Sequence, residues 1–180
     1  MTERVARLVG LGLLGAVLVT GCAQAPQPRA FPTTPAPSSS GSFDCADHIQ
    51  SQGVPRSYHA VLGAVALPVW PAGGIQHTAR DSSNGAPRLF AKSGLLVHTG
   101  VASTITTQAP PSGRALIGWR NSAVTPTQRV EIPACPAGGG ATWLAFPGGF
   151  WVDRPACVRL TVRTATGTAS ERVAVGTPCR

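Results

Sequence analysis

Residues 142–163, TWLAFPGGFWVDRPACVRLTVR, restrict the possible folds of this chain more than any other stretch. Short apolar runs alternate with polar residues here and are divided by Pro-Gly-Gly and by Asp-Arg-Pro. The pattern predicts a strand, a tight turn, a second strand, a break and a third strand. In the last of these, Val158, Leu160 and Val162 share one face, which is typical of an antiparallel strand half buried on a core.

Aromatic rings gather in the two strands around Pro-Gly-Gly. Because side chains alternate along a strand, we expect one ring from each strand, Trp143 or Phe146 and Phe150 or Trp151, to be exposed or half exposed. The inward rings are interpreted as the hydrophobic centre of the fold, which is the commoner use of such residues. An outward Trp143 or Trp151, with Arg154 beside it, is the candidate ligand contact.

The rest of the domain reads as further short strands. The chain has 21 glycines and 17 prolines and shows no convincing helical repeat, apart from one short turn within 45–52 capped by Asp44. The fold predicted for residues 44–180 is an all-β, antiparallel, immunoglobulin-like β-sandwich, with a closed barrel as the alternative. The predicted strands are 57–67, 88–91, 95–98, 102–107, 114–119, 128–132, 142–146, 150–152, 157–164 and 171–175.

Four cysteines lie in the predicted domain: Cys45, Cys135, Cys157 and Cys179. An even number in an exported chain predicts two disulfides, and four cysteines allow three pairings. We expect Cys135–Cys157, flanking the aromatic strands, and Cys45–Cys179, joining the ends of the domain. A metal site is less favoured, because there is no CxxC spacing and Cys45 has only His48 close by.

The N-terminus has the features of a secretory signal peptide over residues 1–21, with Arg4 and Arg7 before an apolar run at 8–19. The sequence Val19-Thr20-Gly21-Cys22 resembles the lipobox of bacterial lipoproteins. The resemblance implies cleavage before Cys22 and attachment of a lipid with two palmitate-like acyl chains to its thiol through a thioether, so that the protein is anchored to the outer face of the cell membrane. An ordinary secreted protein is the alternative.

Residues 22–43 then form a lipidated N-terminus and a linker rich in Pro, Ser and Thr. Such a composition cannot bury enough apolar surface to fold and favours an extended spacer. Three motifs of the domain, in 89–97, 117–119 and 146–152, resemble small exported proteins and lipoproteins of uncharacterised function from actinobacteria. That second resemblance implies no active site.

The charge balance is strongly basic. Without residues 1–21 the chain loses Arg4, Arg7 and Glu3 of its 15 basic and 7 acidic residues, which leaves 13 against 6. A positive domain at the envelope is attracted to anionic lipids or wall polymers, although scattered solvated charge is the simpler reading. Nucleic acid is not an expected partner, because no cluster of arginines with interleaved aromatics is present.

Motifs of catalysis are missing from the sequence, which has no G-x-S-x-G, H-E-x-x-H, P-loop or dinucleotide fingerprint. A glycosidase needs two carboxylates that face each other, and Glu131 with Asp153 is the one pair that could be proposed. Their spacing in the sequence gives no support for such a pair. We therefore expect no catalytic residue, cofactor or metal. The expected function is a non-catalytic binding or structural module, with a cell-wall glycan binder as the alternative and an envelope hydrolase as a weaker one.

Overall fold

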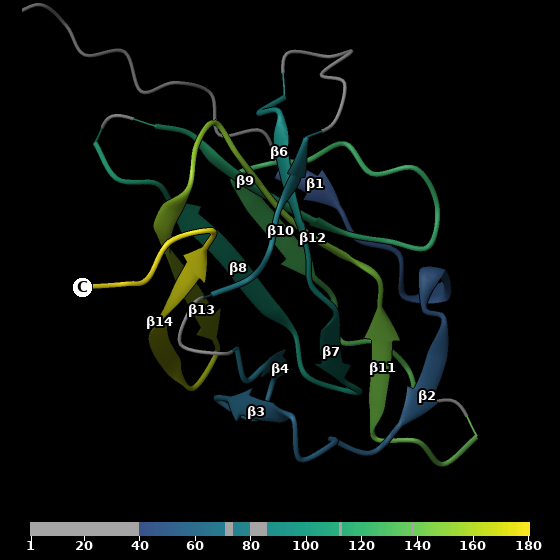
Figure 1. The fold of residues 1–180 in the computed structure, drawn as a ribbon. Helices are drawn as coiled ribbons and strands as arrows, with labels where there is room; N and C mark the ends of the chain where they lie inside the picture. The colour runs from purple at the N-terminus through teal and green to yellow at the C-terminus, as the bar shows by residue number, and fades with distance from the viewer. Residues whose placement is uncertain (1–39, 71–73, 80–85, 112, 138) are drawn as a thin grey trace, which may run out of the picture. The chain divides into compact units, whose positions relative to one another are not determined.

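The computed structural model describes residues 40–70, 74–79, 86–111, 113–137 and 139–180, and Figure 1 shows the fold. The predicted signal peptide, Cys22 and most of the linker lie outside the described residues. The elements are β1 (Ser40–Ser42), η1 (Cys45–Asp47), β2 (Gln50–Gln52), β3 (Tyr58–Val61), β4 (Val65–Pro68), β5 (Thr78–Ala79), β6 (Leu89–Lys92), β7 (Leu95–His98), β8 (Ser103–Gln108), β9 (Ala115–Trp119), β10 (Arg129–Ile132), β11 (Trp143–Phe146), β12 (Gly148–Val152), β13 (Ala156–Thr164) and β14 (Gly167–Val175).

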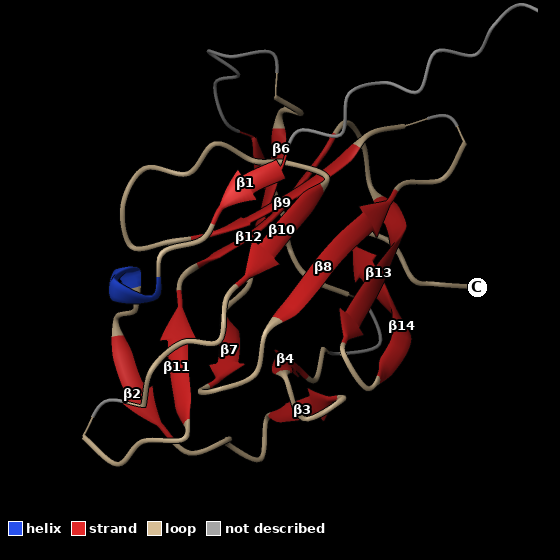
Figure 2. Ribbon diagram, turned by 180° about the vertical axis from the view of Figure 1, so that it is seen from behind, coloured by secondary structure: helices blue, strands red, loops and turns tan. Residues whose placement is uncertain are grey.

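The strands form three sheets. Sheet A has the order β1-β10-β8-β13-β14, sheet B the order β2-β11-β7-β4-β3, and sheet C the order β5-β6-β12-β9. All neighbours are antiparallel except β1 and β10, which are parallel. In Figure 2 the strands β8, β13 and β14 of sheet A lie in front, and β6 and β12 of sheet C lie behind them.

Sheets B and C are joined through a pair of bent strands. β11 pairs with β7 and β12 pairs with β6 in one continuous register, in which Phe146 faces Leu95 before the bend and Gly149 faces Lys92 after it. The predicted tight hairpin at Pro147-Gly148-Gly149 is therefore wrong. The chain bends there and continues into the next sheet, while the Trp119 indole donates a hydrogen bond to the Ser93 carbonyl at the bend (2.9 Å).

One hydrophobic core lies between sheet A and the bent pair of sheets. It takes Ile105, Leu160 and Val162 from sheet A, Phe146 from sheet B and Phe150 from sheet C, all almost fully buried. Alternating apolar residues supply one face of each sheet to this core, as in other sandwiches. The predicted all-β, antiparallel, disulfide-stabilised sandwich is confirmed.

The predicted strand at 57–67 is wrong in its extent. The chain turns back at Leu62 and Gly63, which both have positive φ (53° and 63°), and the Ala64 amide donates to the Val61 carbonyl. Two positive φ values in succession give a turn whose twist matches an antiparallel hairpin. β3 and β4 are therefore a hairpin with β3 at the edge of sheet B.

The ends of several elements also differ from the predictions. The Asp44 carboxylate accepts a hydrogen bond from the Ala46 amide, so the predicted cap is confirmed, although the helical turn covers only η1. The domain starts before the predicted residue 44, because β1 pairs with β10 and Phe43 packs against the core. β14 starts at Gly167, four residues before the predicted strand, since a two-residue turn closes its hairpin with β13.

The disulfides are Cys45–Cys135 and Cys157–Cys179, so the predicted pairing is wrong. Because β1 and β10 are parallel, the segments that follow them leave sheet A at the same end. Cys45 follows β1 and Cys135 follows β10, and the two meet there. The β13–β14 hairpin places Cys157 opposite Ala174, and the chain after β14 returns Cys179 to it. Both pairings follow from strand order, which cysteine spacing does not contain.

A substitution at the bend tests its close packing. A Cβ on Gly149 would overlap the carbonyl oxygen of Ala91 on the neighbouring strand, whereas a Cβ on Gly53 would meet no atom within 4 Å. We expect Gly149→Ala to lower the free energy of unfolding by about 1–3 kcal/mol, as other overpacked sites do. Gly53→Ala is the matched control and should change it by less than about 0.5 kcal/mol in denaturant titrations. Equal effects would contradict the bent pairing.

Candidate functional site

Trp143, a candidate ligand contact, lies on the outer face of sheet B but is buried. Its side chain packs in a small cluster with Ala66, Leu96 and Tyr58, and the ring of His98 meets it edge-on with centroids 4.9 Å apart. Burial in this region raises the pKa of the Tyr58 hydroxyl. Trp143 is 9% exposed and Phe146 is 1% exposed, so the prediction of an exposed ring on this strand is wrong.

Trp151 is half-buried, and the prediction for the second strand is confirmed, because Phe150 is the inward ring. Trp151 lies on the outer face of sheet C, opposite Phe90 and Leu116 in the neighbouring strands. The Trp151 and Phe90 rings lie 4.5 Å apart and tilted by 46°. The two tryptophans thus belong to different sheets and to separate clusters, and they do not build one aromatic platform.

The charged residues named from the sequence are distributed over different sheets. Asp153, after β12, forms an ion pair with the Arg114 side chain (3.3 Å). Its carboxylate also accepts a hydrogen bond from the Arg114 backbone amide (3.0 Å). Glu131, on β10 of sheet A, forms an ion pair with Arg129 instead (3.0 Å). Arg154 is exposed, and its Nε would lie 3.7 Å from a Cβ on Gly113. The structure does not join Glu131 and Asp153 into one carboxylate pair.

Cys45 and His48 are both used in local structure. The cysteine is in a disulfide, and the His48 Nδ1 lies 3.0 Å from the Cys45 carbonyl oxygen. Next to them, Asp47 forms an ion pair with Arg120 (2.7 Å) and accepts a hydrogen bond from the Ser122 hydroxyl. The hydrogen bond from Arg120 lowers the pKa of the Asp47 carboxyl group. Within the described ranges, no group of three or more His, Cys, Asp or Glu side chains is arranged to hold a metal ion.

The outer face of sheet A carries polar residues from several strands. The sequence did not predict that these residues lie on one surface. Side chains of directly paired residues lie on the same face of a sheet. One row across the sheet contains Glu131, Thr104, Arg163 and Thr168. The next rows contain Arg129, Thr106, Thr161 and Ser170, and then Gln108, Arg159 and Arg172.

Four arginines and one glutamate make this outer face positive. Arg129 is paired with Glu131, and Arg172 donates to the carbonyl oxygen of the terminal Arg180. Arg159 and Arg163 are exposed, and in the part of the chain that the structure describes neither has an ion pair or hydrogen bond. The two side chains are therefore available to a ligand.

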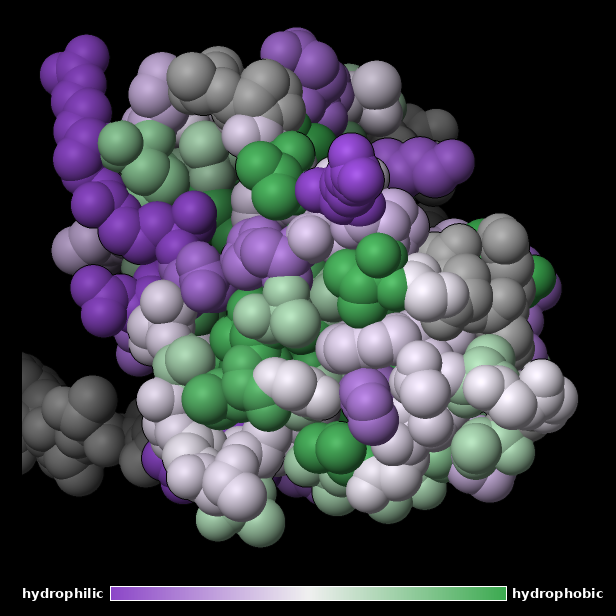
Figure 3. Space-filling view, turned by 90° about the horizontal axis from the view of Figure 1, so that it is seen from below, coloured by the Kyte–Doolittle hydropathy of each residue, from purple (hydrophilic) through white to green (hydrophobic). Residues whose placement is uncertain are grey.

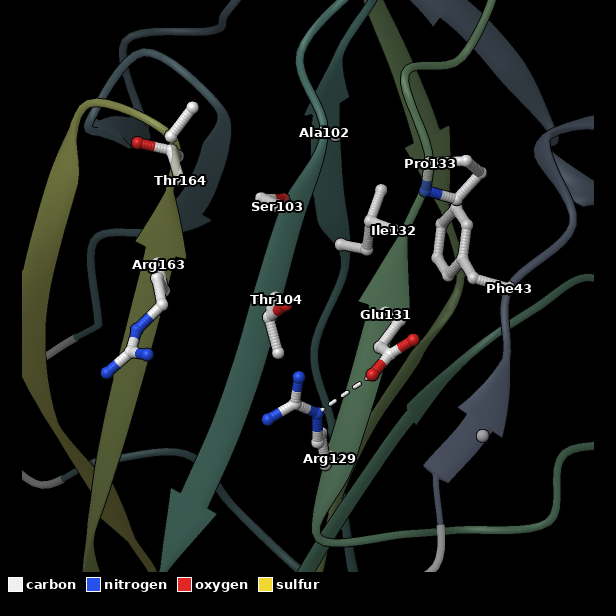
Figure 4. A pocket seen from close by; sticks show the side chains of 12 residues that line it. Phe43, Ala102, Ser103, Thr104, Arg129, Glu131, Ile132, Pro133, Arg163 and Thr164 are labelled. Atoms are coloured by element: carbon white, nitrogen blue, oxygen red, sulfur yellow. Dashed lines mark hydrogen bonds and ion pairs between the residues drawn. The ribbon is translucent and has the colours of Figure 1, made fainter.

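An open groove of about 820 Å³ crosses one end of this outer face. Figure 4 shows Arg163 on β13 and Arg129 on β10, with Thr104 of β8 between them and the Arg129–Glu131 ion pair at one side. Ser103 also lines the groove; its hydroxyl is buried and has no hydrogen-bond partner. This groove and the arginine–threonine rows are the candidate binding surface.

Two of the strands in this surface show alternation in the sequence, RVEI in β10 and CVRLTVRT in β13. That signal separates inward from outward residues within one strand. It does not say which strands are neighbours, so the residues of β8, β10, β13 and β14 could not be assembled into one surface before their pairing was known.

Large exposed apolar side chains lie elsewhere, near sheet B. They are Ile49, Val54, Leu62 and Val69, in segments beside β2, β3 and β4. Figure 3, which views the molecule of Figure 1 from below, shows apolar residues in several places among polar ones. No helix among the described residues has both the length and the apolar character needed to cross a membrane.

Comparison with known proteins does not supply a function for this surface. No protein-family model matches the chain, and no curated protein is significantly similar to it.

Proposed function

We propose that the protein is a lipoprotein anchored at Cys22 to the outer face of the cell membrane, and that its β-domain is a non-catalytic binding module. The resemblance of Val19–Cys22 to a lipobox supports the anchor, and two disulfides suit an oxidising compartment outside the cytoplasm. The observation that carries the binding role is the outer face of sheet A, where a positive, hydroxyl-rich surface includes an open groove.

The contacts of the other candidate residues support a binding role more than an enzymatic one. Asp153 and Glu131 each neutralise their own arginine, and they lie in different parts of the fold. Glycan binding by the tryptophans alone has less support than binding at sheet A, because Trp143 is buried and Trp151 is half-covered by Phe90. A carbohydrate ligand would therefore bind at the arginine–threonine surface of sheet A.

The anchor can be tested by replacing the acylated residue. We expect Cys22→Ala to abolish incorporation of labelled fatty acid, and either to release the domain from the membrane fraction or to leave the precursor unprocessed, because the thioether cannot form. Pro28→Ala, in the linker, is the control and should leave both properties unchanged. Mass spectrometry that finds an unmodified mature N-terminus at another residue of the wild-type protein would contradict the anchor.

The binding role can be tested with the released form of the same variant, which lacks both the lipid and the apolar leader. Incubated with isolated envelope material, the Cys22→Ala protein should sediment with it, because its domain still recognises an envelope component. Recovery of all the protein in the supernatant, at envelope concentrations that exceed those in the cell, would contradict a binding module and favour a structural domain.

A further inference from the structure

We infer that the outer face of sheet A binds an anionic glycan, a polysaccharide that carries phosphate or carboxylate groups, along the Arg159-Thr161-Arg163 ridge of β13 and the adjoining groove. The inference rests on the proposed binding function and names its ligand class. Its first support is charge complementarity, because four arginines on this face meet only one glutamate, which already pairs with Arg129. Guanidinium groups bind phosphate and carboxylate through paired, charge-assisted hydrogen bonds.

The spacing of the free arginines favours a polymer over a small anion. Arg159 and Arg163 are four residues apart on one strand and face the same way, so their Cα atoms are separated by about 13 Å. When both side chains stand perpendicular to the sheet, a single phosphate contacts one guanidinium group, whereas an extended chain with repeated charges contacts both. Arg129, across Thr104 from Arg163, continues the series of cations into the groove.

Hydroxyl groups fill the positions between the arginines. Thr104, Thr106, Thr161 and Ser170 occupy neighbouring sites of the rows, and the Thr161 and Ser170 hydroxyls lie 3.1 Å apart. A hydroxyl both donates and accepts hydrogen bonds, which suits the hydroxyl groups of a sugar. Anions and sugar hydroxyls are thus recognised by adjacent side chains.

The same surface is poorly suited to bind an anionic bilayer. Interfacial membrane binding combines basic residues with apolar side chains that insert between the lipids. The outward residues of the paired rows on sheet A are Arg, Thr, Ser, Gln and Glu, and the large exposed apolar residues lie beside sheet B instead. We therefore choose the glycan, and make membrane binding an outcome of the test.

The test compares two double variants with the same net charge. In the released form of the Cys22→Ala protein, Arg159→Gln/Arg163→Gln alters the proposed site, and Arg56→Gln/Arg88→Gln removes two exposed arginines outside it. Binding is measured to poly(glycerol phosphate), polygalacturonate, neutral dextran and phosphatidylglycerol vesicles. We expect both anionic polymers to bind, the site variant to bind about tenfold more weakly, and the control to change by less than about twofold. Added salt should weaken binding of the wild type.

Several results would overturn the inference. Equal losses in the two double variants would mean that net charge alone attracts the polymers. Binding to dextran but to neither anionic polymer, or to the vesicles but to neither anionic polymer, would assign another ligand and leave the proposed binding module in place. Failure to bind any of the four probes or the envelope material would contradict the binding module as well. Thermal unfolding checks that the variants are folded, and Arg163→Glu provides a second variant that should also weaken polymer binding.

Discussion

Phe150→Ala is expected to lower the free energy of unfolding by about 3–5 kcal/mol, as truncation of a buried aromatic residue generally does. Phe150 is fully buried where the bent strands enter sheet C. Its ring meets Trp119 and Trp70 edge-on, with centroids 5.9 and 6.2 Å away. Removing the ring would leave a cavity between sheet A and sheet C, and the rigid strands around it limit how far the core can collapse.

The next residue along the strand supplies the matched control. Trp151→Ala removes a larger side chain, but one that is half-buried and packs on the outer face of the same sheet. Its effect on unfolding should be clearly smaller than that of Phe150→Ala. Denaturant unfolding under oxidising conditions measures both free energies. Equal destabilisation by the two substitutions would contradict the assignment of Phe150 to the inner face and Trp151 to the outer face.

Removing the Cys45–Cys135 disulfide should have an effect of similar size. The bridge joins residues 90 positions apart, so by chain entropy its loss should destabilise the domain by about 4–5 kcal/mol. The Cys157–Cys179 bridge spans 22 positions and should contribute about 3 kcal/mol. Alanine is the suitable replacement, because Cys135 is fully buried and a serine hydroxyl would lack a partner.

Both double alanine variants are compared with the wild type by thermal or denaturant unfolding, and disulfides are assigned by peptide mapping without reduction. Mapping should give Cys45–Cys135 and Cys157–Cys179 in the wild type. A larger loss on removal of the Cys157–Cys179 bridge would contradict the entropic ranking. Peptides that join Cys135 to Cys157 would contradict the strand order itself.

The candidate surface illustrates how a β-sheet converts local patterns into a site. Arg159 and Arg163 are outward residues of a strand that the sequence already shows as alternating. Their neighbours Thr104 and Arg129 lie 30 or more residues away in the sequence, on other strands. Only the pairing of β13 with β8, and of β8 with β10, places these side chains in one surface.

The sequence by itself determined those features that depend on neighbouring residues. Period-two alternation predicted strand β13, and the Asp44 cap and the presence of two disulfides also followed from local pattern and cysteine number. These are reliable because backbone geometry relates side chains a few residues apart without reference to the rest of the chain.

The tertiary structure decided everything that depends on which strands are neighbours. Pro147-Gly148-Gly149 is a bend because β11 and β12 pair with β7 and β6 rather than with each other, although the same residues suit a hairpin. Trp143 is buried because β4 and β7 bring Ala66 and Leu96 beside it. Disulfide pairing and the composition of the sheet A surface have the same origin. Hydrogen bonds between distant strands set these contacts, and no local pattern in the sequence contains them.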